Sequence, residues 1–184
     1  GVRMKRKEDP RLLTGNGNFA DDIQLPGMLY AAVLRSPHAH AKIVNINIDK
    51  ALEVPGVVKI YTGKDLEGKI GRVPSSWLIP DANLKEAPHY PLAIDRVRYV
   101  GDGVAFVIAE DRYKLRDIVE LIDVEYEILP AVTNQKEALQ DGAPLVHDDI
   151  ENNLALYWKA GEVSDEDIEN AEVVVRASFL EALI

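Results

Sequence analysis

The segment from Val100 to Leu129 limits the fold more than any other part of the chain, because its pattern predicts a strand, a helix and a second strand in succession. The apolar run Val104–Ala109 fits a buried strand. Asp111 is a favourable helix N-cap, and the residues after it predict an amphipathic helix near 112–122. Pro130 ends the second strand. The apolar positions with helical spacing are Leu115, Ile118, Val119 and Ile122.

Shorter elements are expected on both sides of this unit, without strict alternation of strands and helices, which indicates the α+β class. Residues 41–48 alternate as a strand does, although Ile43 falls on the polar face. Four prolines within 63–95 predict a long irregular loop, and residues 1–27 predict an extended arm, both within a single domain over 1–184. Further strands are expected at 28–34, 57–61, 97–100, 154–158 and 173–179, and short helices at 50–54 (capped by Asp49), at 135–140 and after Ser164, with Asp167 completing a capping box.

Charge and composition exclude several classes of function. The 184 residues carry a formal net charge of -10, from 21 basic and 31 acidic residues. This sign argues against nucleic-acid binding, which depends on Lys and Arg. The sequence has no cysteine, so it forms no disulfide and holds no iron–sulfur cluster through thiolates. No apolar run is long enough to span a bilayer and no signal peptide is recognisable, so a cytoplasmic location without a membrane partner is expected.

Two glycine-containing segments resemble nucleotide-binding motifs but lack essential features. Gly15–Ala20 matches G-x-G-x-x-A, yet the carboxylates Asp21 and Asp22 follow it where a helix N-terminus should meet a pyrophosphate. Gly63–Lys69 is a near-match to a P-loop, but Ile70 stands where the Mg²⁺-binding hydroxyl is needed. Both segments are therefore interpreted as ordinary loops.

The side chains best suited to catalysis form no convincing constellation. His38 and His40 could share one face of a strand and approach a metal, with His89 or His147 or scattered carboxylates as further ligands. Histidines that form hydrogen bonds within a loop or an interface are the favoured alternative. The serines at 75 and 76 have no recognisable base nearby in the sequence. No catalytic, cofactor-binding or metal-binding residue is therefore assigned.

Several short motifs, in order along nearly the whole chain, resemble one enzyme family, the molybdenum hydroxylase large subunits. That family includes carbon monoxide dehydrogenases, aldehyde oxidoreductases and xanthine dehydrogenases. One departure is Asp102-Gly103, where the family more usually has Glu-Pro, and this could alter a turn. The matching segments are Lys5–Gly15 with Phe19–Ile23, Leu34–Ala41 (LRSPHAHA), Pro55–Val58 with Thr62–Leu66, Arg98–Ala105 and Val124–Val132.

The resemblance implies an N-terminal α/β hammerhead domain with mixed sheets, a few short helices and the amphipathic helix near 112–122. It implies a non-catalytic component that docks on a molybdopterin-binding chain or domain, with 2Fe-2S clusters and FAD carried by partner chains. The basic arm and the loop 63–95 are the expected contacts. The chain would be either a separately encoded part of a split large subunit or a fragment of an intact one.

Two other functions are kept as alternatives. The first is an independent ligand- or protein-binding module that retains the hammerhead fold, taking a small ligand in the loop 63–95. The second is a stand-alone metal enzyme that uses His38 and His40. A hydrophobic docking surface would be exposed on the isolated chain or covered by self-association into a homo-oligomer.

Overall fold

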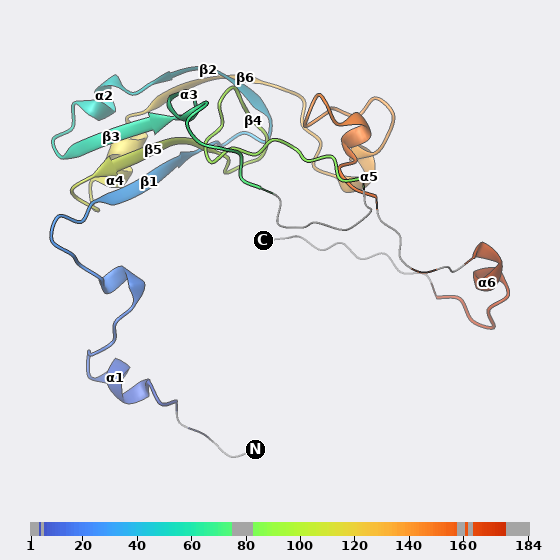
Figure 1. Ribbon diagram of the computed structural model, residues 1–184, viewed down its shortest axis with the longest axis horizontal. Helices are drawn as coiled ribbons and strands as arrows, with labels where there is room; N and C mark the ends of the chain where they lie inside the picture. The colour runs from blue at the N-terminus through green and yellow to red at the C-terminus, as the bar shows by residue number, and fades with distance from the viewer. Residues whose placement is uncertain (1–3, 5, 75–82, 158–160, 162–163, 176–184) are drawn as a thin grey trace.

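A computed structural model describes residues 4, 6–74, 83–157, 161 and 164–175, and its centre is a pair of antiparallel sheets (Figure 1). Each sheet has three strands among the described residues. The first has the order β1 (Tyr30–Arg35), β5 (Gly103–Ala109) and β3 (Val57–Thr62). The second has the order β4 (Arg96–Val97), β2 (Ala41–Asn47) and β6 (Asp123–Ile128).

The helices are short and lie mostly at the ends of strands. α2 (Asp49–Leu52) links β2 to β3, α3 (Gly63–Leu66) follows β3, and α4 (Leu115–Glu120) links β5 to β6. Outside the sheets lie α1 (Asp9–Leu13), a 3-10 turn Ala20–Asp22, α5 (Gln135–Ala138), a 3-10 turn Glu151–Asn153 and α6 (Asp165–Glu169). In Figure 1 the segments with α1 and α6 extend away from the sheets. Within the described residues, no helix has both the length and the apolar character needed to cross a membrane.

The central strand β5 belongs to two apolar clusters, because successive side chains of a strand point to opposite faces. Val104 contributes to a cluster with Ala41 and Val97 of the second sheet. The alternate residues Ala105, Val107 and Ala109 contribute to a larger cluster against α2, β3 and α4. The further buried members of the larger cluster are Ala51, Ile60, Leu115, Ile118 and Ile122.

The predicted strand–helix–strand unit is present as β5, α4 and β6, but its helix is shorter than 112–122. The prediction of Asp111 as N-cap is wrong, because the N-cap is Lys114. The Asp111 carboxylate instead accepts a hydrogen bond from the Tyr113 N–H at 2.8 Å. This local turn, of the kind Asp favours, delays the helix to Leu115.

The irregular position of Ile43 has a structural cause in β2. The pairing of β2 with β6 shifts between Ile43 and Asn45, so Val44 is an extra residue. A β-bulge of this kind reverses the phase of the side chains along a strand. Ala41 and Ile43 are therefore buried before the bulge, and Ile46 is half-buried after it.

Other predicted elements differ from the structure at their ends. The strand expected at 97–100 is reduced to Arg96–Val97, because the Gly101 N–H bonds to the Ser36 carbonyl and turns the chain. No strand forms over 154–157, where the Ala155 carbonyl accepts one bond from the Lys85 N–H but no ladder follows. Residues 173–175 are not a strand either, and 158 and 176–179 lie outside the described residues. The Ser164–Asp167 capping box is confirmed, whereas the helix at 50–54 begins one residue early, after Ile48 rather than Asp49.

Candidate functional site

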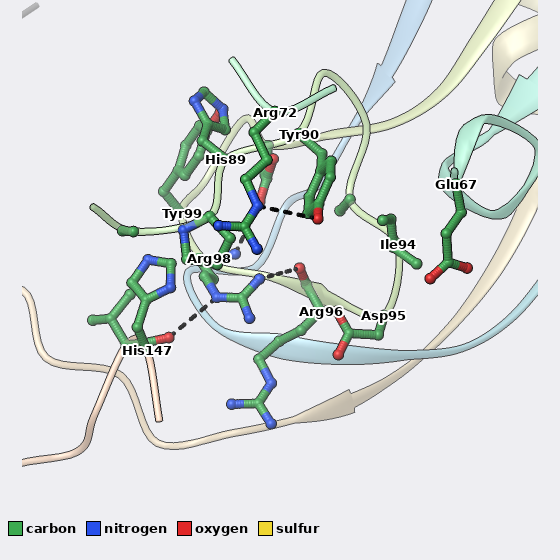
Figure 2. Close-up of a pocket in the computed structure, with 15 residues that line it drawn as sticks. Glu67, Arg72, His89, Tyr90, Ile94, Asp95, Arg96, Arg98, Tyr99 and His147 are labelled. Atoms are coloured by element: carbon green, nitrogen blue, oxygen red, sulfur yellow. Dashed lines mark hydrogen bonds between the residues drawn. The ribbon is translucent and has the colours of Figure 1, made fainter. Parts of the chain in front are cut away.

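The clearest concavity in the described part of the chain is a cavity of about 540 Å³. It lies where the segment after α3, the loop before β4, the turn after β4 and the segment around His147 meet (Figure 2). A volume of this size is within the range of small-molecule pockets. Its polar and aromatic lining includes Arg72, His89, Tyr90, Arg96, Arg98, Tyr99 and His147, with the carboxylates Glu67, Asp95 and Asp102.

Arg98 is held in the cavity wall by backbone carbonyls. Its Nε donates to the Val146 carbonyl oxygen at 3.2 Å and one terminal nitrogen donates to the Arg96 carbonyl oxygen at 3.3 Å (Figure 2). Its own backbone N–H donates to the buried carboxylate of Asp102 at 3.0 Å. The guanidinium group is therefore fixed in orientation by neutral acceptors.

Arg72 and Arg96 differ in their partners. Arg72 donates from Nε to the Tyr90 hydroxyl at 3.4 Å, and its charge lies 6.0 Å from the centre of the Tyr90 ring. Contact with Tyr90 raises the pKa of Arg72, which stays charged at any physiological pH. Arg96 forms an ion pair with Asp148 at 3.2 Å, while its buried Nε has no hydrogen-bond partner.

Aromatic residues complete the wall. The rings of His89 and Tyr99 meet edge to face with centres 6.3 Å apart. Burial, and then the charge of Asp102, raises the pKa of Tyr99, so its hydroxyl is protonated at neutral pH. Burial, and then the charge of Arg98, lowers the pKa of His147. The Nδ1 of His147 is buried without a hydrogen-bond partner.

The structure separates the two histidines that the sequence suggested as a metal pair. His40 is buried and its Nδ1 donates to the Pro130 carbonyl oxygen at 2.8 Å. The His38 ring instead meets the edge of Tyr126, with centres 4.9 Å apart. No group of three or more His, Cys, Asp or Glu side chains is placed to hold a metal ion in the ranges that the structure describes. The prediction that the chain has no catalytic residue stays a prediction.

Both glycine segments are closed by a carboxylate of the chain itself. After Gly63, Asp65 accepts hydrogen bonds from the N–H and the hydroxyl of Thr62, each at 2.8 Å, and these bonds lower the pKa of Asp65. After Gly15, Asp22 accepts a bond from the Phe19 N–H at 3.0 Å. In each segment a carboxylate already bonds to a backbone N–H and adds a negative charge that would repel a phosphate, which supports the interpretation of both as ordinary loops.

Sequence reasoning did not find the cavity. The signal was present as three arginines at positions 72, 96 and 98, with tyrosines at 90 and 99, in and beside the loop 63–95. The residues between positions 74 and 83 lie outside the described part, including the serines at 75 and 76. Only the fold brings Val146 and His147 against this segment from a distant part of the chain.

Asp102-Gly103, the departure from the resembling family, forms a tight junction. The Ser36 N–H donates to the Asp102 carbonyl, and the Gly101 N–H donates to the Ser36 carbonyl, each at 2.8 Å. A Cβ atom on Gly103 would meet the Pro91 carbonyl oxygen at 3.0 Å. The turn is therefore packed closely against both the LRSPHAHA segment and the loop before β4.

Known proteins are similar to this chain in sequence and in fold. The chain is 36% identical to the carbon monoxide dehydrogenase large chain of Afipia carboxidovorans, over 97% of this chain and 23% of that protein. It is 37% identical to the nicotine 6-hydroxylase large subunit of Paenarthrobacter nicotinovorans, over 97% of this chain and 22% of that subunit. A crystal structure of the Cu,Mo-CO dehydrogenase aligns with 84% of this chain and 19% of its own, at a TM-score of 0.69 and 38% identity.

The chain thus spans less than a quarter of the length of these relatives. The sequence pattern of one domain family, described as "Aldehyde oxidase and xanthine dehydrogenase, a/b hammerhead domain", matches residues 14–130. That range includes both sheets. It confirms the α+β hammerhead fold that the resemblance implied. The chain therefore belongs to the a/b hammerhead domain family of aldehyde oxidase and xanthine dehydrogenase.

Proposed function

We propose that this chain is the non-catalytic N-terminal hammerhead component of a molybdopterin-dependent oxidoreductase in the cytoplasm. It docks on a molybdopterin-binding chain or domain, and partner chains carry 2Fe-2S clusters and FAD. Membership of the hammerhead family and the similarity to large subunits of such enzymes support this proposal. The substrate would be chosen by the partner.

The residues of this chain do not fit the cofactors themselves. The sequence has no cysteine for an iron–sulfur cluster. In the glycine segments near Gly15 and Gly63, Asp22 and Asp65 each accept a bond from a backbone N–H, and their charges disfavour a pterin or flavin phosphate there. We therefore assign the cofactors to the partner and no chemical step to this chain.

The observation that carries the proposal is the exposed apolar arm. Leu13, Phe19 and Leu25 are 86%, 63% and 65% exposed, on a segment that extends away from the sheets (Figure 1). Apolar side chains gathered on one segment indicate a surface that another molecule covers. One ion pair, Arg112 with Asp21 at 2.9 Å, ties the arm to the body.

The test is recovery of the partner by the tagged full chain from its source cell. We expect a molybdopterin-binding subunit, identified by mass spectrometry, to co-purify with about one molybdenum per chain. The double variant Phe19→Ser, Leu25→Ser should lower the recovered molybdenum at least about tenfold, because each side chain loses roughly 1.5–3 kcal/mol of burial.

Val58→Ser is the matched control, since Val58 is half-exposed on β3 of the body. It should leave recovery unchanged. Equal molybdenum recovery by both variants would contradict docking through the arm. Stoichiometric pterin or flavin on the chain purified alone would contradict the whole proposal.

The cavity lined by Arg72 and Arg98 favours a second candidate, an independent small-ligand-binding module. It differs from the first proposal in needing no partner. A metabolite that raises the unfolding temperature of the isolated chain would favour this second candidate, provided that no molybdenum-containing protein co-purifies with the chain.

A further inference from the structure

The cavity contains a guanidinium charge that no carboxylate of the described residues neutralises. Arg98 is half-buried and its guanidinium group donates to the carbonyls of Val146 and Arg96. None of the ion pairs among the described ranges includes it. A partly buried cation held by neutral acceptors alone keeps an unfavourable desolvation term that a bound anion would remove.

Arg72 adds a second cation to the same cavity. Its bond to the Tyr90 hydroxyl and its position over the Tyr90 ring fix the side chain at the wall. The ion pairs among the described residues do not include Arg72. Its pKa is nevertheless raised by Tyr90 and, to a lesser extent, by the charges of Glu86 and Asp149. Figure 2 shows Arg72 and Arg98 among the labelled residues that line the cavity, with Tyr90 beside Arg72. Two guanidinium groups with donors to spare match the geometry of a planar oxyanion.

The remaining lining restricts where an anion could lie. Glu67 and Asp95 lie toward one side of the view in Figure 2, and His147 lies toward the other. These carboxylates would repel an anion placed beside them, and so would the buried carboxylate of Asp102, which also lines the cavity. The buried Nδ1 of His147 has no hydrogen-bond partner, so a polar atom of a ligand could satisfy it.

We infer that this cavity binds a small organic acid, whose carboxylate pairs with Arg72 and Arg98 and whose body lies against Tyr90. The carboxylate is favoured because its two oxygens accept parallel bonds from a guanidinium edge. The aromatic lining favours a planar body, and the volume of about 540 Å³ accommodates an acid of benzoate size. The inference goes beyond the proposed function and does not depend on it.

The test uses the full chain and titrates it with sodium benzoate at constant ionic strength, followed by NMR of the arginine side-chain N–H groups. We expect the Arg98 Nε–H signal to shift saturably. Arg72→Gln should weaken benzoate binding about tenfold, because one charge-assisted hydrogen-bonding partner is lost. Arg98→Gln should weaken it at least as much.

The controls separate binding from folding. Arg72 is exposed and, within the described ranges, its side chain donates a hydrogen bond to Tyr90 alone, so Arg72→Gln should keep the circular dichroism spectrum even if Arg98→Gln does not. Arg116→Gln is the matched control for charge. Arg116 is exposed on α4 and does not line the cavity, so this change removes one positive charge and should leave the affinity for benzoate unchanged.

Three outcomes would overturn the inference. The first is the absence of a saturable shift with benzoate or succinate up to about 10 mM, an affinity too weak to be specific. The second is equal affinity for inorganic phosphate with the same response to Arg72→Gln, which would indicate a general oxyanion site. The third is that Arg72→Gln lowers recovery of a molybdenum-containing partner while small carboxylates do not bind to the chain. The cavity would then be part of a protein–protein interface.

Discussion

Gly63 has no alternative residue, because the loop before β4 crosses directly over it. A Cβ atom at this position would lie 2.1 Å from the Ala93 carbonyl oxygen, which is backbone and cannot move aside alone. We expect Gly63→Ala to lower the free energy of unfolding by about 2 kcal/mol or more, as overpacking does. Urea denaturation measures this, and Gly71→Ala, with open space at its Cβ position, should change it little.

His147 makes stability depend on pH in a definite direction. Burial and Arg98 lower its pKa in the folded chain below the usual 6.5. Between the two pKa values of His147 the unfolded chain binds more protons than the folded chain, so the free energy of unfolding decreases as pH falls through this window. The stability that neutral His147 contributes is fully present above about pH 6.5 and is lost below the pKa of His147 in the folded chain.

We therefore expect His147→Gln to flatten the dependence of the urea midpoint on pH in this window. His89→Gln is the matched control, because His89 is exposed, with its ring edge to face with Tyr99 and its Nε2 3.5 Å from the Tyr99 hydroxyl. The same slope in the His147→Gln variant and in the unchanged chain would mean that another group titrates.

Among the elements, the helix α4 packs against β1 and β5 of the first sheet and contributes buried residues to the larger apolar cluster. Ile118 is 1% exposed within the larger apolar cluster, whereas Leu121, just past the helix, is 40% exposed. Ile118→Ala should lower the free energy of unfolding by about 2–5 kcal/mol, and Leu121→Ala by less than about 1 kcal/mol. Chemical denaturation of both variants measures the difference. An equal decrease in the free energy of unfolding for both would contradict the burial of Ile118 in the core.

The sequence predicted the positions of strands and helices better than it predicted which strands pair with one another. A continuous apolar run located β5, which is buried on both faces, and the spacing of apolar residues located α4 and β6. It could not show that β5 and β6 enter different sheets, since strand pairing depends on contacts far apart in the chain. The expected strand at 154–158 shows the same limit, because its apolar residues find no neighbouring strand over 154–157.

The candidate site was less predictable than the fold for a related reason. The rejection of phosphate sites near Gly15 and Gly63 followed from neighbouring carboxylates, which are local features of the sequence. The cavity instead depends on the meeting of Arg98 with Val146, residues 48 positions apart. The three arginines and two tyrosines near this loop are visible in the sequence, but they do not show that a segment near residue 146 packs against them, so the cavity was not predicted.

On the scale of the whole molecule, the buried apolar clusters lie in the centre, whereas the N-terminal arm has exposed apolar side chains and few contacts; Val58 and Ile128 show that the centre exposes some as well. Both apolar clusters lie in the sheets and in α2 and α4. No residue of α1 is buried, nor is any residue of the 3-10 turn Ala20–Asp22. The arm therefore contributes little to the stability of the centre, and its apolar side chains are free to serve an interface.

This division predicts that stability and association can be changed independently. The triple variant Leu13→Ser, Phe19→Ser, Leu25→Ser should unfold at the same urea concentration as the unchanged chain, within roughly 0.5 kcal/mol, because these side chains are exposed before and after the change. In sedimentation velocity, the unchanged chain should self-associate with increasing concentration, since no partner covers the arm, whereas the triple variant should stay monomeric. A triple variant that unfolds early would mean that the arm packs on the centre in solution. Identical sedimentation of both chains would mean that the arm does not mediate self-association. The surface that binds a partner would then lie on the sheets.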